Sequence, residues 1–223
     1  MSKLRYFFLV IASTLLLTSC FEFVEEIKLR EDGSGQATFT LNLSRSKTKL
    51  ASIMLLDSVN GYKVPSKIDI REGVRKMLTK IKATKGISNV KHELDFEEFI
   101  LSVSCDFQSV ENLNQVLINF SSKKQIAQLK KHRHFSFDKG KRLFKRSHHF
   151  DIAREFRKAK KDDQQIFESA SFTGVYRFDE AVAKASNSLA KIAKSKKAVL
   201  LRVKAADIIS NKQTIKNTIQ LQN

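Results

Sequence analysis

The residue types that could bind a metal in this chain are two pairs of histidines. His132 and His134 would share one face of a strand, whereas His148 and His149 are neighbours and would point to opposite faces. No carboxylate or thiol stands at a metal-site spacing from either pair, and the surrounding residues are strongly cationic. Because cations repel cations, we expect no metal site here and no other cofactor.

Nucleophilic and acid–base chemistry has as little support. Cys105 alternates with Leu101, Val103 and Phe107, a pattern that predicts a small buried side chain rather than an activated thiolate. The acidic cluster at 93–98 is better explained as the solvated tip of a hairpin than as a carboxylate pair. The chain has no HExxH, GxSxG, Walker or GxGxxG motif. We therefore expect no enzymatic activity; a hydrolase without a recognisable motif is the less favoured alternative.

Cys20 is the residue whose surroundings indicate a chemical modification. Lys3 and Arg5 precede the twelve-residue apolar run 6–17, and two small residues, Thr18 and Ser19, follow it. Basic, apolar and small residues in this order are typical of an export signal. A helix of twelve residues rises about 18 Å, less than the roughly 30 Å of a hydrocarbon core. A cleaved signal peptide over 1–19 is therefore favoured over a permanent transmembrane helix.

Leu17, Thr18, Ser19 and Cys20 together resemble the bacterial lipobox. The resemblance implies that diacylglycerol is attached to Cys20, that Cys20 becomes the new N-terminus, and that this N-terminus is acylated. An ordinary secreted protein is the alternative. Acyl chains contribute about 0.8 kcal/mol per buried CH₂, so two or three chains would anchor the protein stably. Phe21 follows the cysteine where enteric bacteria often place Asp for inner-membrane retention, which favours the outer membrane of a bacterial cell envelope with two membranes.

Composition indicates one globular domain over 20–223. Apolar residues make up 42% of the chain, and there is a single proline. Once Cys20 is lipidated, Cys105 is the only cysteine left, so an intramolecular disulfide is excluded. Stability must therefore come from the hydrophobic core.

The periodicity of the apolar residues predicts an α+β domain. Period-two alternation predicts two β-hairpins, 22–31 with 36–44 and 90–96 with 99–107. Helical spacing predicts helices over 46–59, from the Ser66 N-cap to Gly86, and after Ser109 to 120. The order ββααββα favours an antiparallel sheet with helices packed on one face. Additional C-terminal strands are predicted over 171–179, 199–204 and 214–221. Over 181–198, turn residues compete with helical propensity, and we favour strands.

Positive charge is the clearest functional signal beyond the anchor. The net charge is +18, and residues 123–161 hold 15 Lys/Arg against 3 Asp/Glu. Residues 123–168 are therefore a candidate basic subdomain inserted in the domain, with short strands at 134–137 and 142–150 and a charged helix over 152–167. The residues that we expect to contact an anionic ligand are Lys130, Lys131, Arg133, Lys141, Arg142, Lys145 and Arg146. A basic surface without a specific ligand is the alternative. Nucleic acid fits the charge but not the envelope compartment.

A second resemblance covers residues 20–45 and 170–221. A strand directly after Cys20, the turn at 31–35, and the strand Tyr176-Arg177-Phe178 before Asn187 and lysine-rich turns resemble bacterial lipoproteins with an LppM-like domain and small lipoproteins of Bacteroidetes-type envelopes. The resemblance implies an α+β domain without catalytic residues that handles membrane lipids or other envelope components.

The sequence thus predicts a lipid-anchored, non-enzymatic envelope lipoprotein. It would act as a binding or structural module whose basic surface contacts anionic lipids, glycolipids or polymers. The alternative is an assembly lipoprotein that recognises an acidic partner protein.

Overall fold

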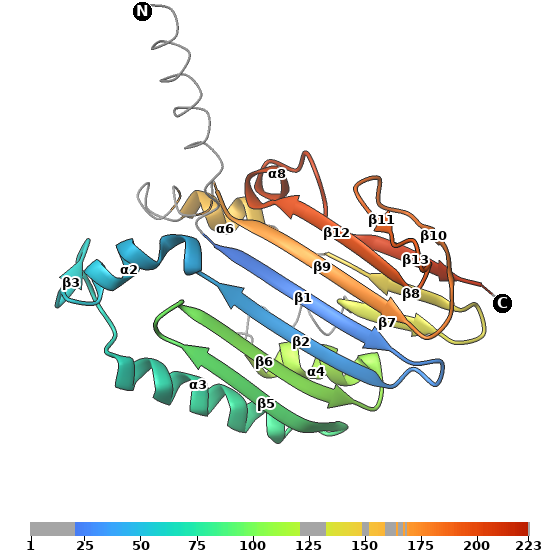
Figure 1. Cartoon of the computed structure of the whole chain (residues 1–223), viewed down its shortest axis with the longest axis horizontal. Helices are drawn as coiled ribbons and strands as arrows, with labels where there is room; N and C mark the ends of the chain where they lie inside the picture. Colours follow the sequence, from blue (N-terminus) through green and yellow to red (C-terminus); the bar gives the residue numbers. More distant parts are fainter. Residues whose placement is uncertain are drawn as a thin grey trace, which may run out of the picture.

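The structure, a computed structural model, describes residues 21–120, 133–148, 152–158, 164, 167 and 169–222. Their main element is a seven-stranded sheet (Figure 1). In spatial order its strands are β11 (Lys191–Ile192), β12 (Ala198–Lys204), β9 (Ser171–Phe178), β1 (Glu22–Leu29), β2 (Gly35–Asn42), β6 (Ile100–Phe107) and β5 (Ile87–Asp95).

The sheet is mixed at its centre. β1 pairs with β9 in parallel, whereas β1–β2, β2–β6, β5–β6, β9–β12 and β11–β12 are antiparallel. The prediction of an antiparallel sheet is therefore wrong at one pairing, that of β1 with β9. Antiparallel neighbours can be joined by a short turn, but β1 and β9 are separated by most of the chain, so no turn fixes their relative direction.

The first hairpin forms as its turn residues predict. Gly33 adopts a φ of 83°, and the Asp32 carboxylate accepts hydrogen bonds from the backbone N–H and the hydroxyl of Ser34 at 2.9 and 2.7 Å. Gly35 is required for space, because a Cβ there would lie 2.0 Å from the carbonyl oxygen of Lys28. These contacts fix the register in which Leu29 pairs with Gly35.

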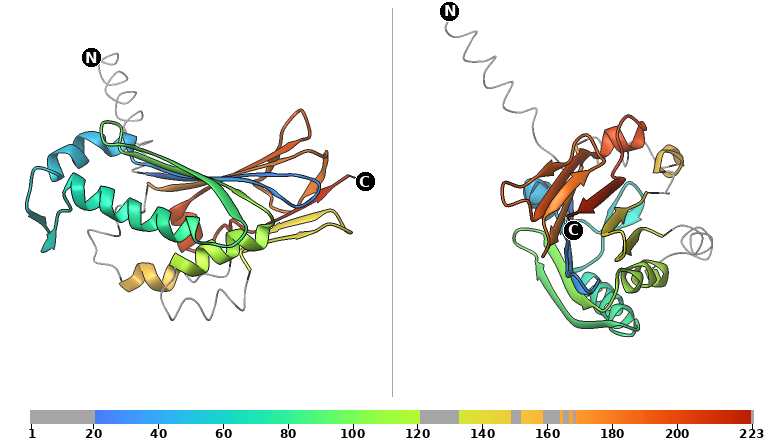
Figure 2. Two further views of the ribbon diagram at one scale, coloured as in Figure 1. Left: turned by 90° about the horizontal axis from the view of Figure 1, so that it is seen from below. Right: turned by 90° about the vertical axis from the view of Figure 1, so that its right-hand side faces the viewer.

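A four-stranded sheet lies on one side of the larger sheet (Figure 2). In spatial order its strands are β10 (Val182–Ala185), β13 (Asn217–Leu221), β8 (Leu143–Arg146) and β7 (Phe135–Asp138). Phe135 and Phe144 from this sheet enter the same core cluster as Ile27, Tyr176 and Ile219. The described part of the basic segment is therefore built into the main core, and the predicted short strands are confirmed in it.

Helices pack on the larger sheet mainly through two clusters. Val74, Leu78 and Ile81 of α3 (Lys67–Lys82) contact Val103 of β6 and Val116 of α4 (Val110–Phe120). At the other edge, Ile208 of α8 (Ala205–Ile209) packs on Phe172, Leu201 and Val203. Strands and helices are both present and strands dominate, as an α+β class requires. A further helix, α6 (Ile152–Lys158), contacts α8.

The α3 N-terminus is confirmed in detail. Ser66 accepts a hydrogen bond from the backbone N–H of Asp69 at 3.1 Å, and Asp69 accepts one from the backbone N–H of Ser66 at 2.9 Å. This reciprocal capping box satisfies two backbone donors that the first helical turn would otherwise leave unpaired.

Residues 43–65 differ from the prediction. Instead of one helix over 46–59, a 3-10 turn (Ser44–Ser46) leads into the short α2 (Lys47–Ile53), and a two-stranded hairpin follows, β3 (Ser58–Val59) with β4 (Tyr62–Lys63). Asn60 and Gly61 both have positive φ, 52° and 81°, which is the backbone of a tight hairpin turn. Their turn chemistry overrides the apolar spacing from which the longer helix was predicted.

The late part of the chain agrees better with the prediction. Residues 181–198 contain β10, β11 and turns rather than a helix, as favoured. The helix α8 was not expected. Within the described ranges, no helix is both long and apolar enough to cross a membrane.

Candidate functional site

Strand register defines two ends of the larger sheet. The proximal end carries Glu22, Asn42, Ile100, Ser171 and Lys204, and the described chain enters it at Phe21, whose carbonyl accepts a hydrogen bond from Ser171 at 3.0 Å. The distal end carries Leu29, Gly35, Phe107, Phe178 and Ala198. An eight-residue strand places the two ends about 23 Å apart. The predicted modification site, Leu17, Thr18, Ser19 and Cys20, lies outside the described residues.

The predicted anionic-ligand residues do not form one surface. Lys130 and Lys131 lie outside the described residues, and Lys141 and Lys145 are exposed. Arg133 is exposed but forms an ion pair with Glu111 at 3.4 Å. Arg142 forms an ion pair with Glu180.

Arg146 requires a correction, because its side chain is buried between the two sheets. Its Nε donates to Glu25 Oε1 at 2.8 Å, and its Nη2 donates to Glu25 Oε2 at 3.0 Å. Tyr176 Oη donates to the same carboxylate at 2.8 Å. The guanidinium also lies over the rings of Phe135 and Phe172, with 5.0 and 5.8 Å to the ring centroids. Arg146 therefore cannot meet a ligand at the surface.

The Glu25–Arg146–Tyr176 cluster has the electrostatics of a structural ion pair. Burial has the largest effect on Arg146 and would lower its pKa, but the charges and hydrogen bonds of Glu25 and Tyr176 together outweigh burial and raise that pKa. Burial, with the charge of Glu25, raises the pKa of Tyr176 well above its ordinary value. Both shifts keep Arg146 charged and Tyr176 neutral at any physiological pH. The cluster links β1 and β9 of the larger sheet to β8 of the smaller one.

The other predicted reactive groups are the Cys105 thiol and the candidate metal ligands. Cys105 is buried, as expected, and burial raises the pKa of its thiol to about 11, so the thiolate is scarce at neutral pH. Among the described residues, no three His, Cys, Asp or Glu side chains are grouped to hold a metal ion. His149 and His132 lie outside the described residues.

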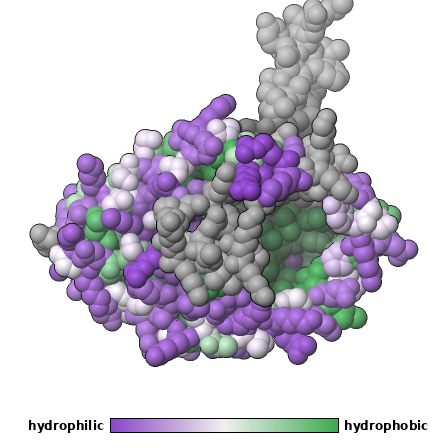
Figure 3. Space-filling view, turned by 180° about the vertical axis from the view of Figure 1, so that it is seen from behind, coloured by the Kyte–Doolittle hydropathy of each residue, from purple (hydrophilic) through white to green (hydrophobic). Residues whose placement is uncertain are grey.

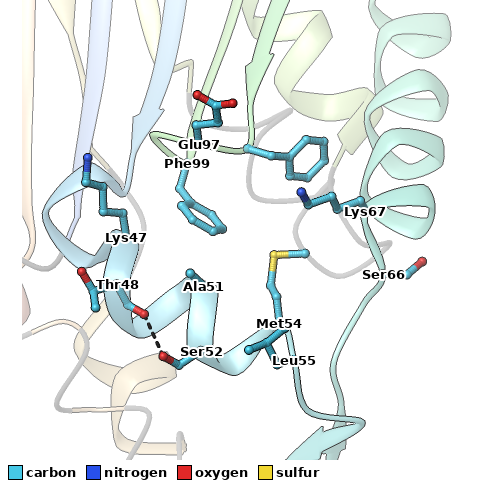
Figure 4. Close-up of a pocket in the computed structure, with 11 residues that line it drawn as sticks. Lys47, Thr48, Ala51, Ser52, Met54, Leu55, Ser66, Lys67, Glu97 and Phe99 are labelled. Atoms are coloured by element: carbon cyan, nitrogen blue, oxygen red, sulfur yellow. Dashed lines mark hydrogen bonds between the residues drawn. The ribbon is translucent and has the colours of Figure 1, made fainter.

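An open apolar pocket lies at the proximal end, and sequence reasoning missed it. It occupies about 860 Å³ between α2, the start of α3 and the β5–β6 turn. In Figure 4, Ala51 of α2, Met54 at the end of α2 and Phe99 of the turn point into it. Its size and apolar lining are those of small-molecule sites in general. The space-filling view shows a hollow over apolar surface on the side of the molecule that is hidden in Figure 1 (Figure 3).

The inward face of the sheet is less completely covered at the proximal end than at the distal end. Along β1, Ile27 and Leu29 are each 1% exposed, whereas Phe23, on the same face, is 36% exposed. Phe23 stacks on Phe39 and Phe172, with ring centroids 6.3 and 6.2 Å apart. α4 and the smaller sheet cover the distal half of this face, whereas Phe23 and Phe39 of the proximal half are only partly buried; Phe172 beside Phe23 is 7% exposed.

Two lysines stand at the rim of the pocket. Lys47 Nζ donates to Glu98 Oε1 at 2.6 Å, and this hydrogen bond, with the charge of Glu98, raises the pKa of Lys47. Lys67 Nζ lies 5.5 Å from the centroid of the Phe96 ring and points toward the pocket in Figure 4. The capping box at Ser66 fixes the helix start from which Lys67 projects. Lys67 thus offers an ammonium group beside an apolar interior, whereas Lys47 is paired with Glu98 and Glu97 also lines the pocket.

The sequence signal for this pocket was weak. The helix predicted over 46–59 was expected to bury Leu50, Ile53, Met54 and Leu56, but Leu56 is 53% exposed and Met54 lines the pocket. The pocket residues come from three segments that meet only because Asn42 at the end of β2 pairs with Ile100 at the start of β6.

Comparison with known proteins gives little. No family model matches the sequence, and a search of the curated proteins finds no match. The chain has a weak structural similarity to the folded domain of the LppM protein of Mycobacterium tuberculosis, solved by NMR: the TM-score is 0.43 at 8% identity, over 93% of this chain and 92% of that one. A TM-score below 0.5 does not establish a shared fold, so the similarity does not decide the function.

Proposed function

We propose that this protein is a lipid-anchored, non-enzymatic binding module of the bacterial envelope, with residues 20–223 as one domain, and that its proximal pocket binds an anionic amphiphile. The acyl part would lie against Met54 and Phe99, and the anionic head group would lie at the rim beside Lys47 and Lys67. The observation that carries the proposal is the combination of apolar lining and two rim lysines in one open pocket.

The position of the pocket supports a ligand taken from a membrane. The described chain enters at the proximal end, one residue after Cys20, and the pocket opens at the same end. An anchor on Cys20 would hold this end close to the lipid surface. Each buried CH₂ of an acyl chain contributes about 0.8 kcal/mol, so even a short chain binds measurably in an apolar pocket. We also propose an outer-membrane location, because Phe21 rather than the Asp of inner-membrane retention follows Cys20.

The pocket is tested by filling it. Ala51 lines the pocket, so Ala51→Trp places an indole where the ligand would lie. Ala183, which is also exposed but lies in β10, provides the matched control Ala183→Trp. Binding of a fluorescent palmitate analogue, and its competition by phosphatidylglycerol and phosphatidylcholine, is measured for each. We expect Ala51→Trp to weaken binding about tenfold, a loss of about 1.4 kcal/mol, and Ala183→Trp to leave it unchanged.

The head-group contact is tested separately. Lys67→Ala removes a rim ammonium, and we expect it to reduce competition by phosphatidylglycerol more than competition by phosphatidylcholine. Equal binding by wild type and Ala51→Trp would refute the pocket as the ligand site. The anchor is tested by intact mass of the wild type beside Cys20→Ser: only the wild type should carry the mass of the acyl chains.

A second candidate function rests on the distal end. Residues 181–198 contain five Lys and no Asp or Glu, and Lys191, Lys194, Lys196 and Lys197 are all exposed. This basic surface faces away from the proximal end and suits an acidic partner protein or an anionic polymer. Charge reversal at Lys194 and Lys196 should abolish recovery of such a partner in a pull-down from envelope extract while leaving palmitate-analogue binding intact.

A further inference from the structure

The most exposed large apolar side chains of the described chain gather in one short stretch. Leu55 is 86% exposed, Ile68 66%, Tyr62 55% and Leu56 53%. We call these four residues the apolar tip. The other large apolar side chains that are exposed in the described ranges reach at most 43%. Single exposed apolar residues are ordinary on protein surfaces, but a group of this exposure indicates a contact surface.

The apolar tip projects from the proximal end. The 3-10 turn Ser44–Ser46 leads into α2 from β2, whose last residue, Asn42, pairs with Glu22 at that end. Both Figure 1 and Figure 2 show α2 and the β3–β4 hairpin reaching beyond the start of β1. A second hollow, of about 770 Å³, separates Leu55 and Leu56 from Pro65 and Ser66, so the segments that carry the tip surround one open space. Within the described chain, no core cluster covers the tip.

The charge around the apolar tip is positive. Residues 44–72 hold six Lys/Arg against three Asp/Glu, and one of those acids, Asp69, is engaged in the α3 capping box. Lys49 precedes the tip residues in the sequence and Lys63 directly follows Tyr62, and both lysines are exposed. Surfaces that enter the head-group region of anionic membranes typically combine apolar side chains with basic residues around them.

We propose that the apolar tip inserts into the membrane that carries the lipid anchor, with Lys49 and Lys63 on anionic head groups. The inference rests on the proposed function, because it takes the anchor on Cys20 as given. The described residues begin at Phe21, next to Cys20 in the sequence, at the same end of the sheet from which the tip projects. Anchor and tip thus give two attachment points, which fix the orientation of the domain. The proximal pocket, which shares Leu55 with the tip, then opens at the bilayer surface and the distal lysines face away from it.

The experiment uses the mature, lipidated protein in vesicles and a dye that reports on the polarity around it. The environment-sensitive dye NBD is attached to a cysteine introduced as Tyr62→Cys, and as Lys139→Cys for a control in the exposed β7–β8 turn near the distal end. Cys105 is buried and remains unlabelled in the folded protein. Vesicles of phosphatidylcholine with and without phosphatidylglycerol carry a spin-labelled lipid as quencher. We expect a blue shift and quenching at position 62, stronger with phosphatidylglycerol, and neither at position 139.

Two sets of substitutions test whether the signal at position 62 depends on the tip residues and their lysines rather than on the dye itself. With the dye at position 62, Leu56→Ser with Ile68→Ser should abolish the blue shift, whereas Leu189→Ser with Ile192→Ser, less exposed apolar residues near the distal end, should not. In the same way, Lys49→Glu with Lys63→Glu should abolish the dependence on phosphatidylglycerol, and Lys191→Glu with Lys194→Glu should leave it unchanged.

The possible failures differ from one another. If Cys20 carries acyl mass but position 62 behaves like position 139, the tip does not insert and the inference is wrong, while the anchor stands. If position 62 shifts but the spin-labelled lipid does not quench it, and the shift grows with the protein density, the tip contacts protein rather than lipid and the inference is again wrong. If Cys20 carries no lipid, the anchor of the proposed function fails, and the inference that depends on it fails too.

Discussion

Replacing Arg146 with methionine should destabilise the protein far more than loss of a surface ion pair. The substitution keeps an unbranched apolar stem but removes the guanidinium that donates to both oxygens of Glu25 at 2.8 and 3.0 Å. Glu25 is 2% exposed, so its carboxylate would be left buried with Tyr176 as the remaining donor. Breaking one partner of a buried ion pair costs about 3–5 kcal/mol, mostly because the other charge stays buried and unpaired.

The chain supplies a control ion pair that also uses β1, on its other face. Arg177 of β9 donates to Glu26 of β1 at 2.8 Å, but on the opposite face, where both side chains are about half exposed. Surface ion pairs contribute about 0–1 kcal/mol, so Arg177→Met should be nearly neutral. The two variants thus compare Arg–Glu pairs formed by adjacent glutamates of β1, one pair buried between the sheets and the other at the surface.

The assay is urea unfolding followed by circular dichroism. With an m-value of about 2–3 kcal/mol per molar, Arg146→Met should lower the midpoint by about 1–2 M and Arg177→Met by less than about 0.5 M. The double variant Glu25→Gln with Arg146→Met removes both charges and leaves an amide oxygen for Tyr176, so we expect it to recover much of the loss. Equal midpoint shifts for Arg146→Met and Arg177→Met, or a double variant as unstable as the sum of its single variants, would refute this reasoning.

Three further predictions concern stability and reactivity. The α3 capping box should contribute about 1 kcal/mol through Ser66, measured as the loss of unfolding free energy in Ser66→Ala. Hydrogen bonds from Ser66 lower the pKa of Asp69 below 3.8 in the folded state, so the Asp69 carboxylate stabilises the fold above that pH. The difference in unfolding free energy between wild type and Asp69→Asn should therefore shrink as the pH falls through the folded-state pKa of Asp69. Cys105, with a pKa of about 11, should react with a thiol reagent such as DTNB only upon unfolding, and rapid labelling of the native protein would contradict its burial. Gly174→Ala should cost about 1–3 kcal/mol in urea unfolding, because its Cβ would lie 2.7 Å from Tyr176 Oη; an unchanged midpoint would show that the hydroxyl moves freely.

Much of the fold was readable from local signals. Period-two alternation placed β1, β2, β5, β6, β9 and β12, and the Ser66–Asp69 pair placed the start of α3, because these patterns depend only on near neighbours in the sequence. The Asn60-Gly61 turn carried an equally local signal, but the helical spacing of Leu50, Ile53 and Leu56 masked it. The strands within the basic segment followed from alternation despite its charge.

The buried cluster shows why the site could not be read in the same way. Alternation along β1 puts Glu25 on the same face as Ile27 and Leu29, which marks it as a buried acid. The sequence does not show which base would join it. Arg146, 121 residues later, looked like a member of a surface cluster of lysines and arginines.

The sequence by itself determined the predicted export signal with Cys20, the basic composition, and most of the strands and helices. All of these depend on residue types at short spacings, which act before any distant contact forms. The tertiary structure alone decided the parallel pairing of β1 with β9, the burial of Arg146 on Glu25, and the meeting of α2, α3 and the β5–β6 turn around an open pocket. Each of these joins segments that are far apart in the chain, so it is set by the packing of the whole core, on which local patterns carry no information.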